Sequence, residues 1–160
     1  PIMKLTGGSC NSFDAWLTYQ GIKTLELRME RQTANALGLA TFLEKHPKIN
    51  FVNYPGLANH PDHSMVKKQM KSGGAMLSFE VLGGLNGAEN CINHLQLATL
   101  APTLGDIDTL VTHPYTMSHG NIDPSIKEQQ RITEGLVRVS VGAETASDII
   151  KDFEQSLQYC

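Results

Sequence analysis

The segment GLVRVSVG, residues 135–142, constrains the fold most strongly, because its polar and apolar residues alternate between two glycines. Successive side chains of an extended strand point to opposite faces of a sheet. Val137, Val139 and Val141 are therefore predicted to share one buried face, and Arg138 is predicted to lie on the other. The pattern predicts a strand with one packed face and one face that carries a permanent charge.

Two interpretations of Arg138 are open from this pattern alone. A charged side chain at the rim of a sheet is usually solvated or ion-paired, since such residues are mostly exposed. Alternatively, Arg138 binds an anion, because its planar guanidinium can donate two parallel hydrogen bonds to a carboxylate.

The rest of the chain predicts an α+β fold, with a small, mainly antiparallel sheet and helices on one face. Strands are predicted at 49–54, 75–82 and 135–142, with an extended segment at 97–105 and a loop at 106–123. Helices are predicted at 12–46 with a break near Gly21, at 61–71 with Pro61 in the first turn, at 86–97, at 124–131, and from Thr145 with Asp148 completing a capping box.

The first helical region carries an apolar stripe. Its members recur every three or four residues: Leu25, Met29, Gln32, Ala36, Leu39 and Leu43. Asn11 or Ser12 is expected to cap this region, and Trp16 is expected to pack in the core.

Composition excludes several classes of protein. The 160 residues include 41% hydrophobic residues, which fits one globular domain or a large piece of a longer chain. A net charge of −3 without a basic block gives no support for a nucleic-acid partner, and no apolar run reaches the roughly 20 residues of a membrane span. Cys10, Cys91 and Cys160 are far apart, which predicts reduced thiols in a cytoplasmic protein.

Two pairs of histidines could suggest a metal site, namely His60 with His63 and His113 with His119. Neither pair has a third ligand at a recognised spacing, so these are expected to be surface or loop residues and no metal is expected. The glycine pairs lack the spacing of phosphate-binding loops and are interpreted as turns: Gly7-Gly8, Gly73-Gly74 and Gly83-Gly84.

Five ordered blocks make the chain recognisable over nearly its whole length. They are FDAWL…GIKTLELRMERQTANAL, YPGL…HP, GGAMLSFEV, TLGDIDTLVTHP and EGLVRVSVG. Together they resemble the C-terminal part of the trans-sulfuration family of pyridoxal-phosphate enzymes, and the last two blocks are most similar to those of methionine γ-lyases and O-acetylhomoserine sulfhydrylases.

The resemblance implies the C-terminal domain of a fold-type-I homotetramer that acts on a sulfur amino acid. It implies that Arg138 binds the substrate α-carboxylate, with Thr109 beside it, and that Leu110, His113 and Thr116 belong to an active-site loop. It also implies that residues 1–45 form a helical link to an upstream cofactor domain and that residues 46–160 bind substrate.

The resemblance places the Schiff-base lysine upstream, in a Ser-x-Thr-Lys context that no lysine here has, Lys4 included. The chain alone is therefore expected to be inactive, with pyridoxal 5'-phosphate bound mainly by the upstream region. The alternative interpretation is a non-catalytic α+β domain for binding or assembly.

Overall fold

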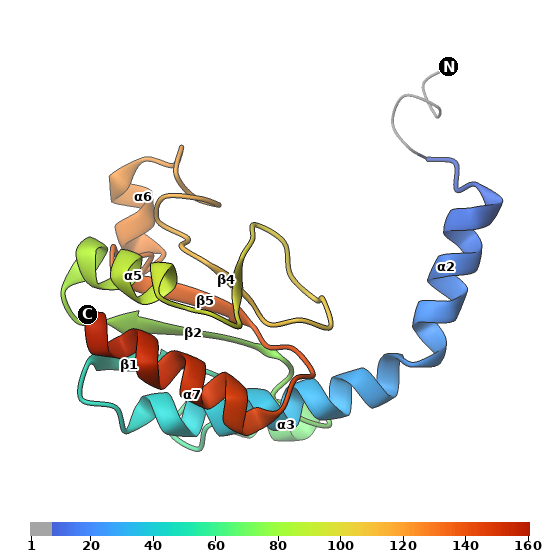
Figure 1. Cartoon of the computed structure of the whole chain (residues 1–160), viewed down its shortest axis with the longest axis horizontal. Helices are drawn as coiled ribbons and strands as arrows, with labels where there is room; N and C mark the ends of the chain where they lie inside the picture. The colour runs from blue at the N-terminus through green and yellow to red at the C-terminus, as the bar shows by residue number, and fades with distance from the viewer. Residues whose placement is uncertain (1–7) are drawn as a thin grey trace.

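The computed structural model describes residues 8–160, and its centre is a five-stranded sheet in the order β1-β2-β5-β4-β3. The strands are β1 (Ile49–Asn53), β2 (Met76–Val81), β3 (Thr99–Leu100), β4 (Leu110–Thr112) and β5 (Leu136–Ser140). All neighbours pair antiparallel except β3 with β4, which are parallel. Figure 1 labels β1, β2, β5 and β4. The predicted α+β fold with a mainly antiparallel sheet is confirmed.

The two central strands have the predicted alternation. Val137 pairs with Phe79 and Val139 pairs with Leu77, and these four side chains are buried on one face. Arg138 lies on the opposite face. The sheet therefore has one face in the core and one face available for a site.

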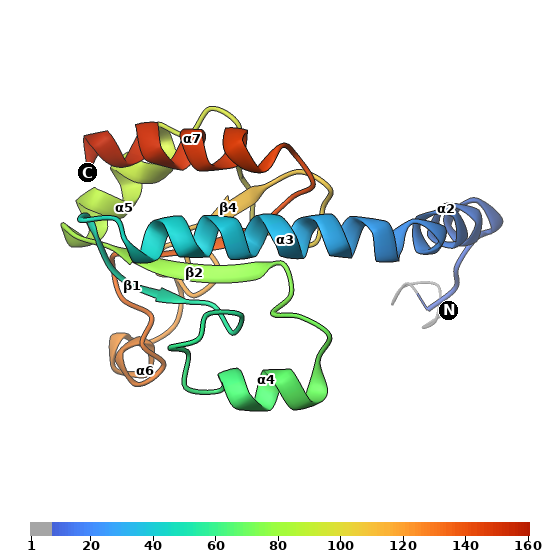
Figure 2. The same ribbon diagram turned by 90° about the horizontal axis from the view of Figure 1, so that it is seen from below.

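The longer helices cover the buried face. They are α3 (Leu25–Glu44), α5 (Gly84–Asn93) and α7 (Ala146–Ser156), and α7 continues into the 3-10 helix η1 (Leu157–Tyr159). The rings of Phe79 and Phe153 meet edge to face at 5.9 Å, which seats α7 against β2. Figure 2 shows the short helices α4 (His63–Gln69) and α6 (Pro124–Gln129) away from this layer.

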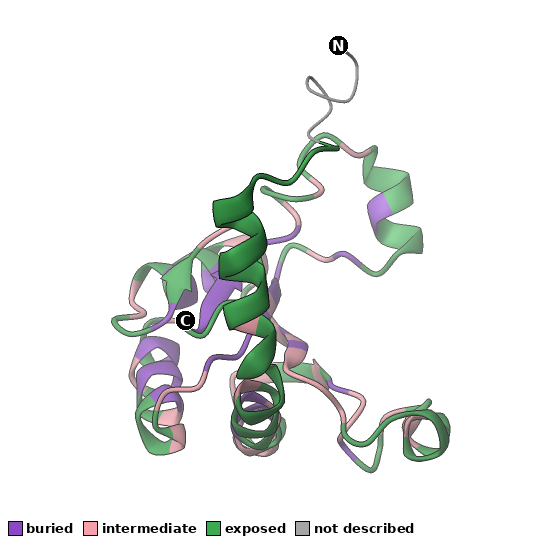
Figure 3. Ribbon diagram, turned by 90° about the vertical axis from the view of Figure 1, so that its right-hand side faces the viewer, coloured by how far each residue is buried: buried purple, intermediate pink, exposed green. Residues whose placement is uncertain are grey.

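The first helical region divides into two helices. Helix α2 (Ser12–Lys23) ends at Thr24, three residues after the predicted break at Gly21, and Asn11 caps its start as predicted. No residue within the described range 12–23 is buried, as Figure 3 shows, and Trp16 is 55% exposed. The prediction that Trp16 packs in the core is wrong for this chain, because α2 projects beyond the sheet and no other described element covers it.

Helix α3 has buried residues from Gln32 onward, and its first turns are exposed. The predicted stripe is buried at Gln32, Ala36, Leu39 and Leu43, whereas Leu25 and Met29 are exposed. The division of the chain at residue 45 stays a prediction, and the contacts of α3 with β1, β2 and α7 join its second half to the core.

Several local predictions need correction. Strand β4 lies inside the predicted loop 106–123, and the extended segment 97–105 contributes only the two residues of β3. Helix α5 begins and ends earlier than predicted, and Pro61 precedes α4 instead of lying in its first turn. Thr145 is the N-cap of α7, but its side chain makes no capping hydrogen bond. Lys4 and Gly7 lie outside the described residues.

Candidate functional site

A row of polar side chains crosses the sheet on the face opposite the helices. Thr112 of β4 pairs with Arg138 of β5, which pairs with Ser78 of β2, which pairs with Asn53 of β1. Directly paired residues of antiparallel strands project from the same face. The row places Arg138 between a hydroxyl on each neighbouring strand.

The guanidinium of Arg138 is held at one nitrogen. Its Nη2 donates to the carbonyl oxygen of Thr103 at 2.9 Å and to Oγ1 of Thr112 at 2.9 Å. Thr112 Oγ1 donates its own proton to the carbonyl of Ala101, so a lone pair is left for Arg138. Nε of Arg138 is buried without a hydrogen-bond partner among the described residues.

This arrangement limits how Arg138 can bind a carboxylate. A guanidinium has two edges that bind a carboxylate with two hydrogen bonds, one formed by Nε and Nη2 and the other by the two Nη atoms. Nη2 belongs to both edges and already donates to two acceptors. A carboxylate that forms two hydrogen bonds with Arg138 therefore displaces either the carbonyl oxygen of Thr103 or Oγ1 of Thr112. A carboxylate that binds through Nη1 alone leaves both of these oxygens in place.

The loop between β3 and β4 passes over this face of β5. Ser140, two residues from Arg138 and on the same face, accepts a hydrogen bond from the backbone N–H of Gly105 at 2.9 Å. Arg138 and Ser140 therefore fix the loop at Thr103 and at Gly105. The loop is a wall of the site, although the sequence singled out neither Thr103 nor Thr112.

Thr109 lies at the other end of this loop and is fully buried. Its hydroxyl donates to Oε2 of Glu144 at 2.8 Å and accepts from the backbone N–H of Gly142 at 2.9 Å, and its own N–H donates to Oε1 of Glu144 at 2.6 Å. The hydroxyl of Thr109 thus joins the loop to the end of β5. A direct contact of Thr109 with a substrate carboxylate stays a prediction.

The remaining candidate residues, Leu110, His113 and Thr116, lie at and just after β4. Leu110 is buried and pairs with Ser140. His113 lies 2.8 Å through Nε2 from the carbonyl of Glu134 and 2.7 Å through Nδ1 from Oγ1 of Thr116. A carbonyl only accepts, so a neutral His113 carries its proton on Nε2 and accepts the Thr116 hydroxyl at Nδ1. His113 therefore ties the chain after β4 to the turn before β5, and the predicted role of these three residues in an active-site loop is untested.

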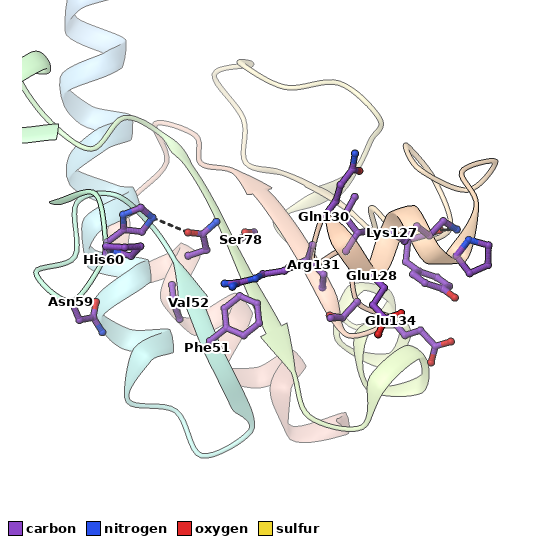
Figure 4. A pocket seen from close by; sticks show the side chains of 17 residues that line it. Phe51, Val52, Asn59, His60, Ser78, Lys127, Glu128, Gln130, Arg131 and Glu134 are labelled. Carbon is purple, nitrogen blue, oxygen red and sulfur yellow. Dashed lines mark hydrogen bonds between the residues drawn. The ribbon is translucent and has the colours of Figure 1, made fainter. Parts of the chain in front are cut away.

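A cavity of about 820 Å³ opens beside the polar row. Ser78 and Asn53 line it from the sheet, Arg131 and Lys127 line it from the α6 region, and His60 closes one side (Figure 4). His60 Nε2 lies 2.9 Å from Oδ1 of Asn53, at the end of the row. Arg138 does not line this cavity, so the cavity adjoins the arginine site and does not contain it.

The residues described do not fit a metal or a Schiff-base cofactor. They include no group of three or more His, Cys, Asp or Glu side chains placed to hold a metal ion. Of the lysines that the structure describes, Lys127 alone is buried, and its ammonium is used by the carbonyls of Tyr115 and Gly120 and lies 4.2 Å from the Tyr115 ring centroid. In the described part of the chain, no helix combines the length and the apolar character that crossing a membrane requires.

The fold and the arginine site together resemble one class of protein, the pyridoxal-phosphate enzymes of sulfur amino-acid metabolism. Residues 2–158 match the model of the family described as Cys/Met metabolism PLP-dependent enzyme. The chain belongs to this family.

Individual relatives agree with the family match. The chain is 48% identical over 154 residues to the L-methionine gamma-lyase of Fusobacterium nucleatum subsp. polymorphum, covering 96% of this chain and 39% of that protein. It is 43% identical over 151 residues to the cystathionine beta-lyase of Coxiella burnetii, covering 94% of this chain and 39% of that protein. The chain thus spans about two fifths of the length of these relatives.

A solved structure agrees in fold. The cystathionine gamma synthase of Xanthomonas oryzae pv. oryzae, crystallised with cystathionine, superposes with a TM-score of 0.88 at 37% identity, covering 92% of this chain and 38% of that one.

Proposed function

We propose that this chain is the substrate-carboxylate-binding part of a pyridoxal-phosphate enzyme that carries out γ-elimination or γ-replacement. The substrate class is methionine, homocysteine, cystathionine or O-acylhomoserine. The observation that carries the proposal is Arg138, which lies on the face of the sheet opposite α3, α5 and α7, with one guanidinium nitrogen held and another buried without a partner among the described residues.

Arg138 binds and orients the amino acid in this proposal. An ion pair to the α-carboxylate fixes one end of the substrate, and the remaining bonds at the α-carbon then take a defined direction. Thr103 and Thr112 act as positioning residues, because they hold the guanidinium in place. Thr109 acts with Glu144 to keep the loop that carries Thr103 in its place.

The cofactor enters from outside the described residues. Pyridoxal 5'-phosphate, when bound, would supply the electron sink for removal of a proton from the α-carbon and then from the β-carbon. The Schiff-base lysine would come from the upstream region in this proposal, and the 160-residue chain alone would then be inactive. The exposed apolar residues of α2 support a further part of the proposal, in which α2 links to the upstream domain inside a homotetramer. Three free cysteines support a cytoplasmic location.

The experiment that tests the proposal replaces Arg138 in the complete enzyme. Arg138→Lys keeps the charge but loses the two-pronged geometry, and a hydrogen bond to a charged group contributes about 1.5–3 kcal/mol. We expect kcat/KM to fall roughly 10- to 100-fold for Arg138→Lys and further for Arg138→Ala. The melting temperature should fall by only a few degrees, because the side chain lies outside the packed face and its removal takes away only the bonds to Thr103 and Thr112.

Arg28→Lys is a matched control. Among the residues that the structure describes, Arg28 bonds only to the carbonyl of Gly21 and the hydroxyl of Thr24, so its replacement by lysine should leave turnover unchanged. Near-normal turnover of Arg138→Ala, together with a lowered melting temperature, would rule out the carboxylate role and support a structural arginine in a binding or assembly domain.

A further inference from the structure

The helix-covered side of the sheet holds a pair of thiols that the proposed function does not use. Cys91 lies in α5 and is fully buried, and Cys160 follows η1 and is half-buried. They lie far apart in the sequence, yet Figures 1 and 2 both place the end of the chain beside α5. The pair is on the face opposite Arg138, so its chemistry does not depend on the arginine site.

Both sulfur atoms flank one residue, Ser156, the last residue of α7. Sγ of Cys91 lies 3.4 Å from Oγ of Ser156, and Sγ of Cys160 lies 3.9 Å from the carbonyl oxygen of Ser156. The two thiols therefore both lie beside Ser156, at the end of α7.

The segment that carries Cys160 is anchored at this point. Leu157 is fully buried, and the ring of Tyr159 stacks on that of His94 at 3.8 Å with an angle of 7° between the planes. Nζ of Lys48 donates to the carbonyl oxygens of Gln158 at 3.1 Å and Cys160 at 2.6 Å. These contacts keep the Cys160 thiol close to Cys91 in the folded chain.

The environments of the two thiols differ in a way that orders their reactivity. The interaction with the Cys91 thiol lowers the pKa of Cys160, and the nearby Lys48 ammonium acts in the same direction. The same thiol–thiol interaction, and then burial, raise the pKa of Cys91. The thiolate is the nucleophile in thiol oxidation, so Cys160 is the thiol that reacts first with a soluble oxidant.

We propose that Cys91 and Cys160 form a redox-sensitive dithiol, which a peroxide converts to an intrachain disulfide between α5 and the end of η1. The oxidant is hydrogen peroxide. The Cys160 thiolate attacks one peroxide oxygen, the O–O bond breaks, and hydroxide leaves to give a sulfenic acid. The Cys91 sulfur then attacks the Cys160 sulfur, the S–O bond breaks, and the departing hydroxide takes up the Cys91 proton as water. The two thiols lose two electrons, and the peroxide is reduced to two molecules of water.

The disulfide would close a long loop that contains β3, β4, β5 and α7. A cross-link over a long loop lowers the entropy of the unfolded chain, so the oxidised form should melt at a temperature several degrees higher than the reduced form.

The test uses the chain with Cys10→Ser, which leaves Cys91 and Cys160 as its only cysteines. The reduced protein receives one equivalent of hydrogen peroxide, its free thiols are alkylated with iodoacetamide, and it is digested without reduction for mass spectrometry. We expect a peptide that joins Cys91 to Cys160 within a monomer. The same reaction in concentrated guanidinium chloride should give much less of it, because the fold supplies the proximity.

Two single variants complete the test. Cys160→Ser should leave Cys91 unmodified by peroxide in the folded chain, because the buried thiol has no exposed partner to start the reaction. Cys91→Ala should allow Cys160 to continue to the sulfinic acid or to cross-link two chains. The proposal is overturned if the parent protein gives sulfinic acid at Cys160 with Cys91 still free, if it forms only dimers between chains, or if the folded and unfolded chains give the same yield of the intrachain disulfide.

Discussion

Thr112→Val in the complete enzyme tests whether the orientation of Arg138 matters as well as its charge. Thr112 is fully buried, and valine has nearly its shape, so the change removes the hydroxyl without opening a cavity. The change removes the bond at 2.9 Å from Arg138 Nη2, and it removes the donor to the carbonyl of Ala101. Arg138 keeps its bond to the carbonyl of Thr103.

The expected magnitude follows from this count of bonds. One hydrogen bond to a charged group contributes about 1.5–3 kcal/mol, and the retained bond to Thr103 offsets part of the loss. We expect the enzyme to lose about 1–2 kcal/mol of transition-state stabilisation, so that kcat/KM falls roughly 5- to 30-fold. The free energy of unfolding should also fall by about 1–3 kcal/mol, because the carbonyl of Ala101 is left without its donor.

Steady-state kinetics and thermal melting of three variants separate the two effects. Thr112→Ser keeps the hydroxyl and should restore kcat/KM, although it lacks the methyl group. Thr41→Val is the matched control, because the Thr41 hydroxyl bonds only to the carbonyl of Leu37 within α3. Unchanged kcat/KM in folded Thr112→Val would refute a positioning role for Thr112.

Two further predictions concern stability. Asp152 is buried, and its carboxylate accepts hydrogen bonds from the backbone N–H groups of residues 96–98 at 2.7–3.0 Å. Asp152→Ala should therefore lower the free energy of unfolding, measured in urea, by about 3–5 kcal/mol. An unchanged urea midpoint would contradict this prediction. Burial first, and then the nearby Lys48 ammonium, lower the pKa of His46 below its ordinary value of 6.5, so the unfolded state binds the proton more readily. The contribution of neutral His46 to the free energy of unfolding is therefore complete above pH 6.5 and is lost as the pH falls through the lowered pKa. The urea midpoint, measured at a series of pH values, should fall less steeply with acid in His46→Gln than in the parent chain.

The parts of the fold that could be predicted are those with a local pattern. The alternation in 75–82 and 135–142 predicted both central strands and the face of Arg138, because a strand repeats every two residues. The three residues of β4 are all buried and show no alternation, so their pattern could not be distinguished from that of a loop. The break between α2 and α3 lies at Thr24, where φ is −107° and ψ is 3°, although glycine at 21 gave the stronger local signal.

The candidate site was predictable only in its central residue. The contacts that hold Arg138 join it to Thr103, 35 residues away, and to Thr112, 26 residues away. No spacing in the sequence indicates which carbonyl or hydroxyl will lie beside a side chain after the strands pair. The resemblance pointed to Thr109, whose hydroxyl the fold uses to join Glu144 to the end of β5.

The same contacts bear on how strongly Arg138 can bind. A free arginine side chain carries about 2 kcal/mol of rotamer entropy, which is lost when a ligand immobilises it. Thr103 and Thr112 restrict the guanidinium before any ligand arrives, so part of this entropy is lost on folding and not on binding. A carboxylate that exchanges with one of the two threonine oxygens also replaces a hydrogen bond with one charged partner by one in which both partners are charged. The threonines therefore favour binding as long as their bonds to Arg138 are weaker than those of the carboxylate, and a neutral carbonyl and a neutral hydroxyl meet that condition.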